Sequence, residues 1–367
     1  MQSLDVIIPS YRLNEHELAP ILSLDGPQDF DIRFIVIADN PSVKVPALIE
    51  KMAAEGDLNL IINEINLGFS ETRNKGIDAA KADWILLLDD DILPQRDMLF
   101  VFCDAIRSNP EHIGYIGITN FPAPINTVTK AFTLNTGGYY DVGRSKKEHV
   151  WFPTANIALN RKLLGDRRFL PHLTKAGEDI EFFSRNSFEN NQKYIALPEA
   201  TVIHPWWDNG KSQLRRMFNY GWGKSDVIDL KTLRDYSFYN FPNAPEAIFF
   251  LMMAALVIIP LTGKIVWLPT IILVILTAEY LTLLIKVVHV GKIFSPAVAF
   301  QMMLQKNANE CGFVAGCIFN KKFHCLTKRL DVTFNSRNPR SYAFNRWRIL
   351  KLVLTLLGLT AVYPIVF

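Results

Sequence analysis

Two long apolar segments in the C-terminal third of the chain restrict its fold more than any other feature. Residues 247–263 carry Thr262 as their one polar side chain, and residues 265–285 carry Glu279 as their one charged side chain. These segments of 17 and 21 residues have about the length needed to cross a bilayer core. Buried core helices are the alternative, but runs this long are uncommon in a soluble core. With a third run at the end of the sequence, we predict spans at about 247–263, 265–287 and 349–367.

The distribution of charge indicates which side of the membrane the flanking segments occupy. Residues 321–351 contain nine Lys and Arg residues and a single acidic residue. Because positively charged loops stay in the cytoplasm, we expect a multi-pass protein with this segment and residues 1–235 on the cytoplasmic face. Residues 294–319 are only moderately apolar, and we predict that they form an interfacial helix lying on the membrane. Glu279 is either a functional intramembrane carboxylate or a hydrated side chain near the cytoplasmic interface.

The overall composition excludes several classes of protein. The chain has 49% hydrophobic residues together with 39 basic and 36 acidic residues, which argues against disorder, a collagen and a disulfide scaffold. Its four cysteines show no C-x-x-C spacing, so we expect reduced structural thiols and neither a zinc ribbon nor a redox pair. The first residues show no basic segment followed by an apolar one, and no cleavable signal is expected.

Residues 1–235 alternate short apolar runs with helical stretches. Helices are predicted at Ala47–Glu55 and Ser70–Ala80. Strands are predicted at Leu4–Pro9, Phe34–Ala38, Asn59–Ile62 and Trp84–Leu88. Nearly continuous apolar strands separated by helices indicate an α/β domain with a mostly parallel sheet covered on both faces. Since ligands bind beyond the carboxyl ends of the strands in such sheets, the residues that follow each strand are the candidates for a site.

Three consecutive carboxylates, Asp89, Asp90 and Asp91, directly follow the predicted strand Trp84–Leu88. Adjacent carboxylates repel each other and cost stability unless a cation or strong donors offset the charge. Mg²⁺ and Mn²⁺ take oxygen ligands and often bridge to substrate phosphates. A solvated acidic turn is the alternative, but the position at the end of a buried strand favours a metal-assisted site.

The order of the motifs resembles glycosyltransferase family 2, which comprises inverting nucleotide-sugar transferases with the GT-A fold. The matching segments are residues 6–12, 37–40, 66–70, 73–76, 88–94, 177–181, Arg185 and 202–205. The resemblance covers roughly residues 3–225 and becomes specific through the order of its pieces. It implies a Rossmann-like GT-A catalytic domain over residues 1–235, followed by an α-helical membrane region over residues 236–367.

The resemblance implies roles for residues that border the donor. Asp39 matches a carboxylate that accepts a hydrogen bond from a uracil-type ring N–H, and Gly68 lets the backbone approach the donor. The implied donor-side residues are Pro9, Ser10, Tyr11, Arg12, Asp39, Gly68, Arg73, Asp89 and Asp90. Asp91 matches a ligand of Mn²⁺ or Mg²⁺, and His204 matches a histidine that completes the metal shell in many relatives. A lone histidine before a proline is otherwise more often structural.

Asp179 is the candidate catalytic base. An inverting transfer needs a carboxylate to take the acceptor hydroxyl proton, and the predicted start of a helix would also favour an acid there. A helix-capping acid pair with Glu178 is the alternative. The candidate acceptor-side residues are Asn156, Glu178, Trp206 and Trp207. The two tryptophans suit sugar rings as well as a juxtamembrane anchor, and both interpretations stay open.

These features predict a membrane-attached, metal-dependent inverting glycosyltransferase that moves a sugar from a nucleotide donor, with UDP favoured, to a lipid-linked acceptor in the bilayer. Two alternatives remain, a transferase acting on polyprenyl phosphate and a non-catalytic sugar-binding or scaffold protein. Nucleic acid is not an expected partner because the basic segment lies between membrane segments. Residues 213–217 lack the tryptophan of the processive synthases' Q-x-x-R-W motif, which argues against polymer synthesis.

Overall fold

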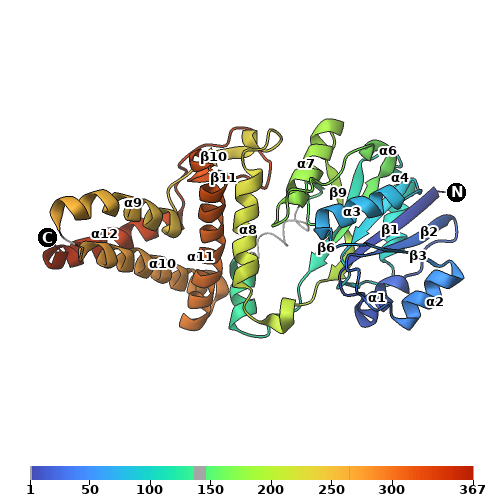
Figure 1. Cartoon of the computed structure of the whole chain (residues 1–367), viewed down its shortest axis with the longest axis horizontal. Coiled ribbons are helices and arrows are strands. Elements are labelled where there is room, and N and C mark those ends of the chain that lie inside the picture. The colour runs from blue at the N-terminus through green and yellow to red at the C-terminus, as the bar shows by residue number, and fades with distance from the viewer. Residues whose placement is uncertain (1, 136–145, 264, 367) are drawn as a thin grey trace. The chain divides into compact units, whose positions relative to one another are not determined.

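A computed structural model describes residues 2–135, 146–263 and 265–366. These residues fall into two compact units (Figure 1). The first unit comprises residues 1–123 and 138–209, and the second comprises residues 124–137 and 210–367. Residues 210–235 group with the second unit, and the predicted extent of the catalytic domain, residues 1–235, stays a prediction.

The first unit is built on a mixed sheet with nine strands among the described residues. The strands are β1 (Gln2–Ser10), β2 (Phe30–Ala38), β3 (Leu58–Ile62), β4 (Trp84–Leu88), β5 (Leu93–Pro94), β6 (Gly114–Asn120), β7 (Glu148–His149), β8 (Asn156–Asn160) and β9 (Tyr194–Ile203). Their order is β3-β2-β1-β4-β8-β6-β9-β5, with β7 paired to β9. Within the run β3-β2-β1-β4, each strand is parallel to the next. Strand β8 is antiparallel to both β4 and β6. The four predicted strands and the mostly parallel α/β architecture are confirmed.

Helices flank this sheet, and apolar strands supply its core. The helices are α1 (Glu15–Leu22), α2 (Ala47–Glu55), α3 (Gly68–Ala79), α4 (Met98–Ser108), α6 (Arg161–Leu164) and α7 (Glu178–Asn190). Both predicted helices are present, and α3 begins two residues before the predicted Ser70. Gly76 allows α3 to lie close to the sheet, because a Cβ atom there would collide with Ile7 and Ile37. This close approach fixes the start of α3 relative to the ends of β1 and β2.

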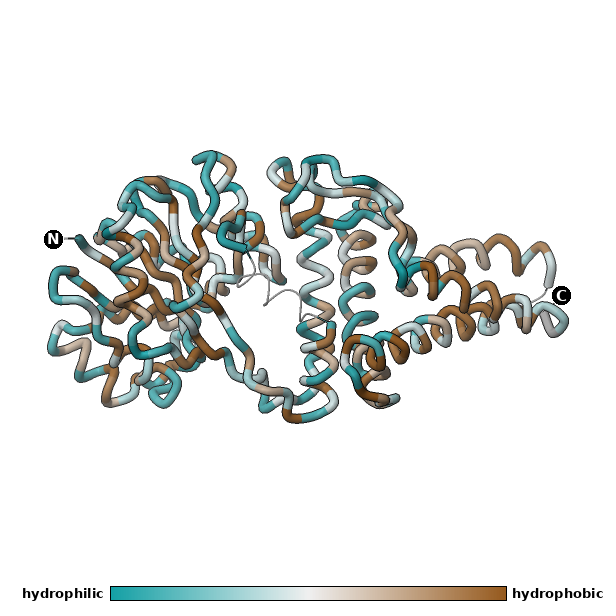
Figure 2. Tube along the Cα trace, turned by 180° about the vertical axis from the view of Figure 1, so that it is seen from behind, coloured by the Kyte–Doolittle hydropathy of each residue, from teal (hydrophilic) through white to brown (hydrophobic). Residues whose placement is uncertain are grey.

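The second unit is mainly helical. Its helices are α8 (Leu214–Val227), α9 (Ala244–Thr262), α10 (Trp267–Gly291), α11 (Pro296–Phe319) and α12 (Arg346–Val366), and a small ladder joins β10 (Ser237–Tyr239) to β11 (Lys328–Leu330). Helices α9, α10 and α12 are long and apolar enough to cross a membrane, in agreement with the predicted spans. Figure 2 shows hydrophobic residues along these three helices. Few of their residues are buried inside the protein, as expected for surfaces that face lipid.

Helices α8 and α11 lie side by side and run crosswise to α9, α10 and α12 (Figure 1). Glycines bring the two helices together. A Cβ atom on Gly221 would collide with the carbonyl oxygen of Asn309, and one on Gly312 would collide with that of Phe218. If α9, α10 and α12 cross the membrane, α11 lies along its surface, which agrees with the predicted interfacial helix. That placement stays a prediction.

Candidate active site

Strands β1, β2 and β4 end at one edge of the sheet. Ser10 at the end of β1 pairs with Ala38 at the end of β2, and β4 is parallel to β1. Asp39 follows β2, and the aspartate triplet follows β4. Tyr11 and Arg12, which follow β1, are exposed, and Pro9 precedes them within the strand. The topology therefore gathers the candidate donor-side segments at the carboxyl edge.

Asp39 is held by three hydrogen bonds. Its Oδ1 accepts from Asn63 Nδ2 and from the backbone N–H of Leu67, and its Oδ2 accepts from the backbone N–H of Gly68, all at 2.8 Å. Gly68 has a φ of +78°, and space for a side chain is open around it. This left-handed backbone favours glycine. The carboxylate thus fixes the loop before α3 and keeps open space beside its backbone.

Asp90 and Ser10 connect the ends of β4 and β1. The Ser10 hydroxyl donates to Asp90 Oδ2 at 2.6 Å and accepts from the backbone N–H of Leu13 at 3.0 Å. Burial raises the pKa of Asp90 to about 6, while the Ser10 hydrogen bond opposes the rise and the charges of Asp91 and Asp89 add to it. The protein's own side chains therefore compensate the negative charge of the aspartate triplet only in part.

Asp91 and His204 form the candidate metal pair. His204 Nδ1 lies 2.8 Å from the carbonyl oxygen of Pro205, which can only accept, so we assign the proton to Nδ1. With the proton on Nδ1, Nε2 can act as an acceptor, and it lies 3.4 Å from Asp91 Oδ1. Two acceptors that face each other need a proton or a cation between them. This geometry fits a divalent cation held by Asp91 and His204.

The ring of His204 is fixed by aromatic neighbours. Phe121 and Trp207 contact it with ring centroids 5.3 and 5.6 Å away, and Phe121 stacks on Trp206 at 4.8 Å. Trp206 is buried, and its indole N–H donates to the carbonyl oxygen of Ala123. Both tryptophans proposed for the acceptor side thus pack around Phe121. Phe121 itself was not among the residues expected from the sequence, because a lone phenylalanine after a strand carries no distinctive signal.

Arg73 joins two halves of the site that are distant in sequence. Its Nη2 lies 3.3 Å from Asp89 Oδ1, and its Nη1 lies 3.2 Å from Glu178 Oε1. The guanidinium is buried and is flanked by the rings of Phe69 and Phe169 at 5.9 and 5.8 Å. A single guanidinium group therefore bridges the aspartate triplet and the start of α7, where the candidate base lies.

Glu178 and Asp179 are the first two residues of α7, as the sequence indicated. Helix α7 follows Gly177, whose φ of +91° favours glycine at that position. Burial, together with the charge of Glu178, raises the pKa of Asp179, while its hydrogen bond from the Ile180 N–H and the charge of Arg73 oppose the rise. A carboxylate with a raised pKa is better suited to accept a proton than an ordinary aspartate.

Two residues near this region have structural partners. Asn156 is fully buried in β8, and its Nδ2 donates to the carbonyl oxygen of Ala200 at 2.9 Å, so its side chain lies in the core. Glu181 is buried and pairs with Arg185, with its Oε1 2.7 Å from the guanidinium Nε. Glu181 therefore supports α7. The acidic groups that remain at the start of α7 are Glu178 and Asp179.

Negative charge exceeds positive charge among the candidate side chains. The carboxylates are Asp39, Asp89, Asp90, Asp91, Glu178 and Asp179, and the guanidiniums are those of Arg12 and Arg73. Arg12 Nη2 lies 3.9 Å from Asp91 Oδ2 and is mostly exposed, so it neutralises that group only weakly. Oxygen ligands with an uncompensated negative charge fit a hard divalent cation, and Asp91 with His204 would hold it.

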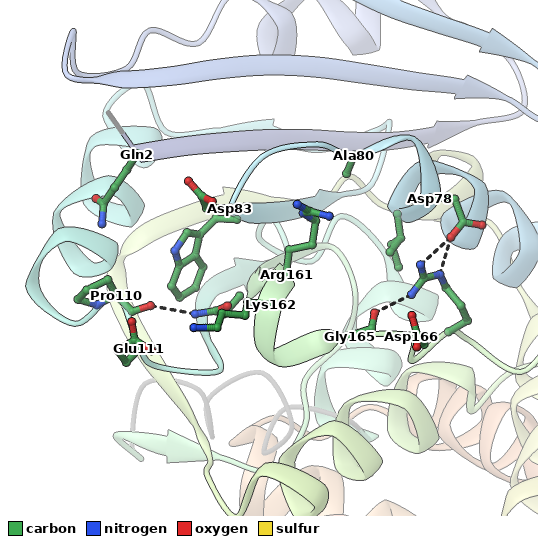
Figure 3. Close-up of a pocket in the computed structure, with 14 residues that line it drawn as sticks. Gln2, Asp78, Ala80, Asp83, Pro110, Glu111, Arg161, Lys162, Gly165 and Asp166 are labelled. Carbon is green, nitrogen blue, oxygen red and sulfur yellow. Dashed lines mark hydrogen bonds and ion pairs between the residues drawn. The ribbon is translucent and has the colours of Figure 1, made fainter.

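A separate cavity of about 590 Å³ lies in the first unit (Figure 3). Its lining includes Gln2 and Trp84, the first residues of β1 and β4, so it opens at the amino ends of these strands. None of the candidate site residues lines it. In parallel sheets ligands bind at the opposite, carboxyl edge, and we assign no function to this cavity.

Comparisons with known proteins support the same family. Residues 5–169 match the family model described as Glycosyl transferase family 2. An uncharacterized glycosyltransferase of Haemophilus influenzae is 28% identical over 135 residues, which cover 36% of this chain and 43% of that protein. The amylovoran biosynthesis glycosyltransferase AmsB of Erwinia amylovora is 30% identical over 103 residues, covering 26% of this chain and 33% of AmsB. The matched region thus spans less than half the length of either relative.

A solved structure resembles a larger part of the chain. The mannosyltransferase PcManGT from Pyrobaculum calidifontis, in complex with GDP-Man and Mn²⁺, aligns with a TM-score of 0.52 and covers 87% of each chain at 16% sequence identity. This likeness supports the GT-A fold. Residues 5–169 thus match the Glycosyl transferase family 2 model, and the chain adds three helices that are long and apolar enough to cross a membrane.

Proposed function

We propose that the protein is a membrane-attached, metal-dependent inverting glycosyltransferase that uses a nucleoside-diphosphate sugar. The bridging position of Arg73 supports this proposal most directly, because its guanidinium contacts both Asp89 of the aspartate triplet and Glu178 beside the candidate base. A donor held at the triplet would then present its sugar near the start of α7. The family match over residues 5–169 supports the same chemistry.

In this proposal Asp179 takes the proton from the acceptor hydroxyl as the oxygen attacks the anomeric carbon. The raised pKa of Asp179, caused mainly by burial, suits proton acceptance. A cation bound by Asp91 and His204 would neutralise charge on the departing diphosphate. Arg73 would hold Asp89 and Glu178 in place, and Gly68 would leave room for the donor.

The hydrogen bonds of Asp39 favour a uridine donor. A carboxylate offers about four acceptor positions, and three of those on Asp39 already accept from Asn63, Leu67 and Gly68. One position remains for a base, which suits the single ring N–H of uracil. Guanine presents a ring N–H and an amino group side by side, and PcManGT was solved with GDP-Man, so a guanosine donor is the alternative to test.

A donor screen tests the proposal directly. The full chain in nanodiscs that contain a lipid-linked glycan or polyprenyl phosphate as acceptor would be given UDP-, GDP- and TDP-linked sugars with Mn²⁺ or Mg²⁺, and release of the nucleoside diphosphate would be measured. We expect metal-dependent release with a UDP-sugar. Asp179→Asn should lower turnover by about 10²–10⁴-fold while donor binding, measured by calorimetry, persists. Donor binding without release from the intact chain under any condition would favour a non-catalytic sugar-binding protein.

We further propose a lipid-linked glycan as the acceptor and the cytoplasmic face as the location of the first unit. The three apolar helices would keep the chain at the bilayer, and the basic segment 321–351 favours the cytoplasmic side. The competing acceptor is polyprenyl phosphate itself. Mass analysis of the product separates these two possibilities, because only the competing reaction leaves the sugar joined to the lipid through a single phosphate.

A further inference from the structure

Asp39 is held by one side chain to which the sequence assigned no role, that of Asn63. Asn63 directly follows β3 and is fully buried. Its backbone N–H donates to the carbonyl oxygen of Ala38 at 2.9 Å, which keeps Asn63 beside the end of β2. Its side-chain Nδ2 donates to Asp39 Oδ1 at 2.8 Å, whereas the donors of Leu67 and Gly68 are backbone N–H groups. A change of side chain can therefore remove the contact of Asn63 with Asp39.

Lys75 of α3 fixes which end of the Asn63 amide faces Asp39. Its Nζ lies 2.8 Å from Asn63 Oδ1, and an ammonium group can only donate. The amide oxygen of Asn63 therefore faces Lys75, and the amide NH₂ group faces Asp39. The positive charge also polarises the amide, which strengthens the hydrogen bond that Nδ2 gives to the carboxylate. Lys75, Asn63 and Asp39 thus form a chain of two hydrogen bonds with a fixed direction.

This chain makes the two oxygens of Asp39 unequal. Oδ1 accepts from Asn63 Nδ2 and from the N–H of Leu67, whereas in the part of the chain that the structure describes Oδ2 accepts from the N–H of Gly68 alone. Each carboxylate oxygen has about two acceptor positions, so both positions of Oδ1 are filled and one position of Oδ2 is free. Uracil and thymine present a single ring N–H and can use that position. Guanine presents a ring N–H beside an amino group, and this pair needs a free position on both oxygens.

We propose that Asn63, oriented by Lys75, determines which nucleobase the donor carries, because it fills Oδ1 of Asp39. A base with a single ring N–H binds at Oδ2, and guanine is disfavoured because Oδ1 cannot accept from its amino group. Asn63 and Lys75 are positioning residues, since they act through Asp39. The assignment of Asp39 to the donor base rests on the proposed function, whereas the filling of Oδ1 does not.

Asn63→Leu removes the donor to Oδ1 with little change in side-chain size, and Lys75→Met removes the group that orients the amide. Because Asn63 is buried and its replacement can unfold the protein, the half-buried Lys75 supplies the second variant. Lys75→Arg keeps a cationic donor and is the conservative rescue. Lys81→Met, at an exposed position after α3, is the control with the same charge change. Calorimetry of the full chain in nanodiscs with Mn²⁺ would measure the affinities for UDP and for GDP, and thermal melting would verify folding.

We expect the wild type, Lys75→Arg and Lys81→Met to bind UDP about tenfold more tightly than GDP, as one hydrogen bond to a charged group predicts. Asn63→Leu should lower this ratio of affinities by about tenfold, and Lys75→Met should lower it in the same direction. A purely structural role would weaken the binding of both nucleotides equally. An unchanged ratio in the folded variants would therefore overturn the inference.

The remaining outcomes separate this inference from the proposed function. A wild-type chain that binds GDP more tightly than UDP would overturn the role of Asn63, and sugar transfer from a GDP-sugar would still support a transferase. Transfer from a UDP-sugar with an unchanged ratio in the variants would likewise overturn the role of Asn63 alone. A preference for UDP that depends on Asn63, without sugar transfer to any acceptor tested, would contradict the proposed function and leave the specificity role intact. Binding of neither nucleotide would overturn both.

Discussion

At the scale of single residues, the carboxylates of the site differ in how their charge is stabilised. Asp39 accepts three hydrogen bonds, and Asp90 accepts one from Ser10. Asp179 is half-buried, lies beside Glu178 and accepts from the N–H of Ile180. Three donors therefore hold the carboxylate of Asp39, whereas burial raises the pKa of Asp179. This contrast agrees with the roles proposed above, in which Asp39 faces the base of the donor and Asp179 takes the proton.

The rate of sugar transfer should depend on pH through Asp179. Because burial raises the pKa of Asp179, the acidic limb of kcat/KM should lie at higher pH than an ordinary aspartate would give. A pH–rate profile of the full chain measures it. Asp179→Asn should lower the rate by about 10²–10⁴-fold and remove this limb. A limb near pH 4 in the wild type would contradict the assignment.

The same pKa shift predicts the stability of Asp179→Asn without donor or metal. A raised pKa in the folded state means that unfolding favours ionisation, so wild-type stability falls as pH rises above the unfolded value of about 4, by up to about 1.4 kcal/mol per pH unit until the folded pKa is reached. The variant lacks this loss and should melt at a higher temperature at pH 7.5. The gain should shrink toward pH 4, and the exposed Asp57→Asn should show no gain.

His204 should act on metal affinity. His204→Ala removes the lone pair that faces Asp91 and should raise the Mn²⁺ concentration for half-maximal activity by about 10–100-fold, with partial rescue by excess Mn²⁺. His16→Ala, at an exposed position in α1, is the control. A Mn²⁺ titration of activity measures the effect. A uniform loss of activity at every metal concentration would instead indicate that His204 only supports the fold.

At the scale of elements, the start of α3 and the α8–α11 pair depend on glycine for different reasons. Gly68 supplies a left-handed backbone with open space around it, whereas Gly312 supplies the absence of a side chain against the backbone of Phe218. Gly68 leaves open space at the carboxyl edge of the sheet, where the proposed donor would bind. Gly312 holds together two helices that run across the candidate membrane helices.

Gly312→Ala should destabilise the second unit. The added methyl group would meet the carbonyl oxygen of Phe218, and backbone atoms cannot move aside cheaply, so overpacking should cost about 1–3 kcal/mol. Gly291→Ala is the control, because its methyl group would meet a side-chain atom of Leu134 at 3.0 Å. Thermal melting of the full chain in nanodiscs compares them. Equal stability of the two variants would show that α8 and α11 are farther apart in solution.

At the scale of the whole molecule, the charge pattern predicts a topology. If α9 and α10 cross the bilayer as a hairpin, the turn between them lies opposite the basic segment 321–351. With Cys311, the exposed cysteine among the four, replaced by Ser, a cysteine at Leu261 should react with a membrane-impermeant maleimide in intact cells. A cysteine at Ser336 should react only after permeabilisation. Protection of both positions in intact cells would indicate that the hairpin does not cross.

Much of the fold and part of the site could be predicted from the sequence because their signals are local. A buried strand shows itself as an apolar run, as in Trp84–Leu88, and three aspartates after such a run mark a strand end that carries charge. A lipid-facing helix likewise needs apolar residues along its length. Motif order could place Asp179 at the start of a helix. It made Asn156 a candidate for the acceptor side, and it could not show that the buried Asn156 side chain donates a hydrogen bond to the carbonyl oxygen of Ala200 in the core.

The amino-acid sequence by itself determined the strand and helix segments, the aspartates at the end of β4 and the three apolar helices, because each depends on neighbours within a few residues. Only the tertiary structure decided that Arg73 contacts Glu178, 105 positions away, that Phe121 packs on His204, and that Lys306 and Lys351 meet at Glu279. Such contacts depend on how whole elements pack. Side chains that are distant in sequence meet only after the burial of apolar surface has fixed that packing.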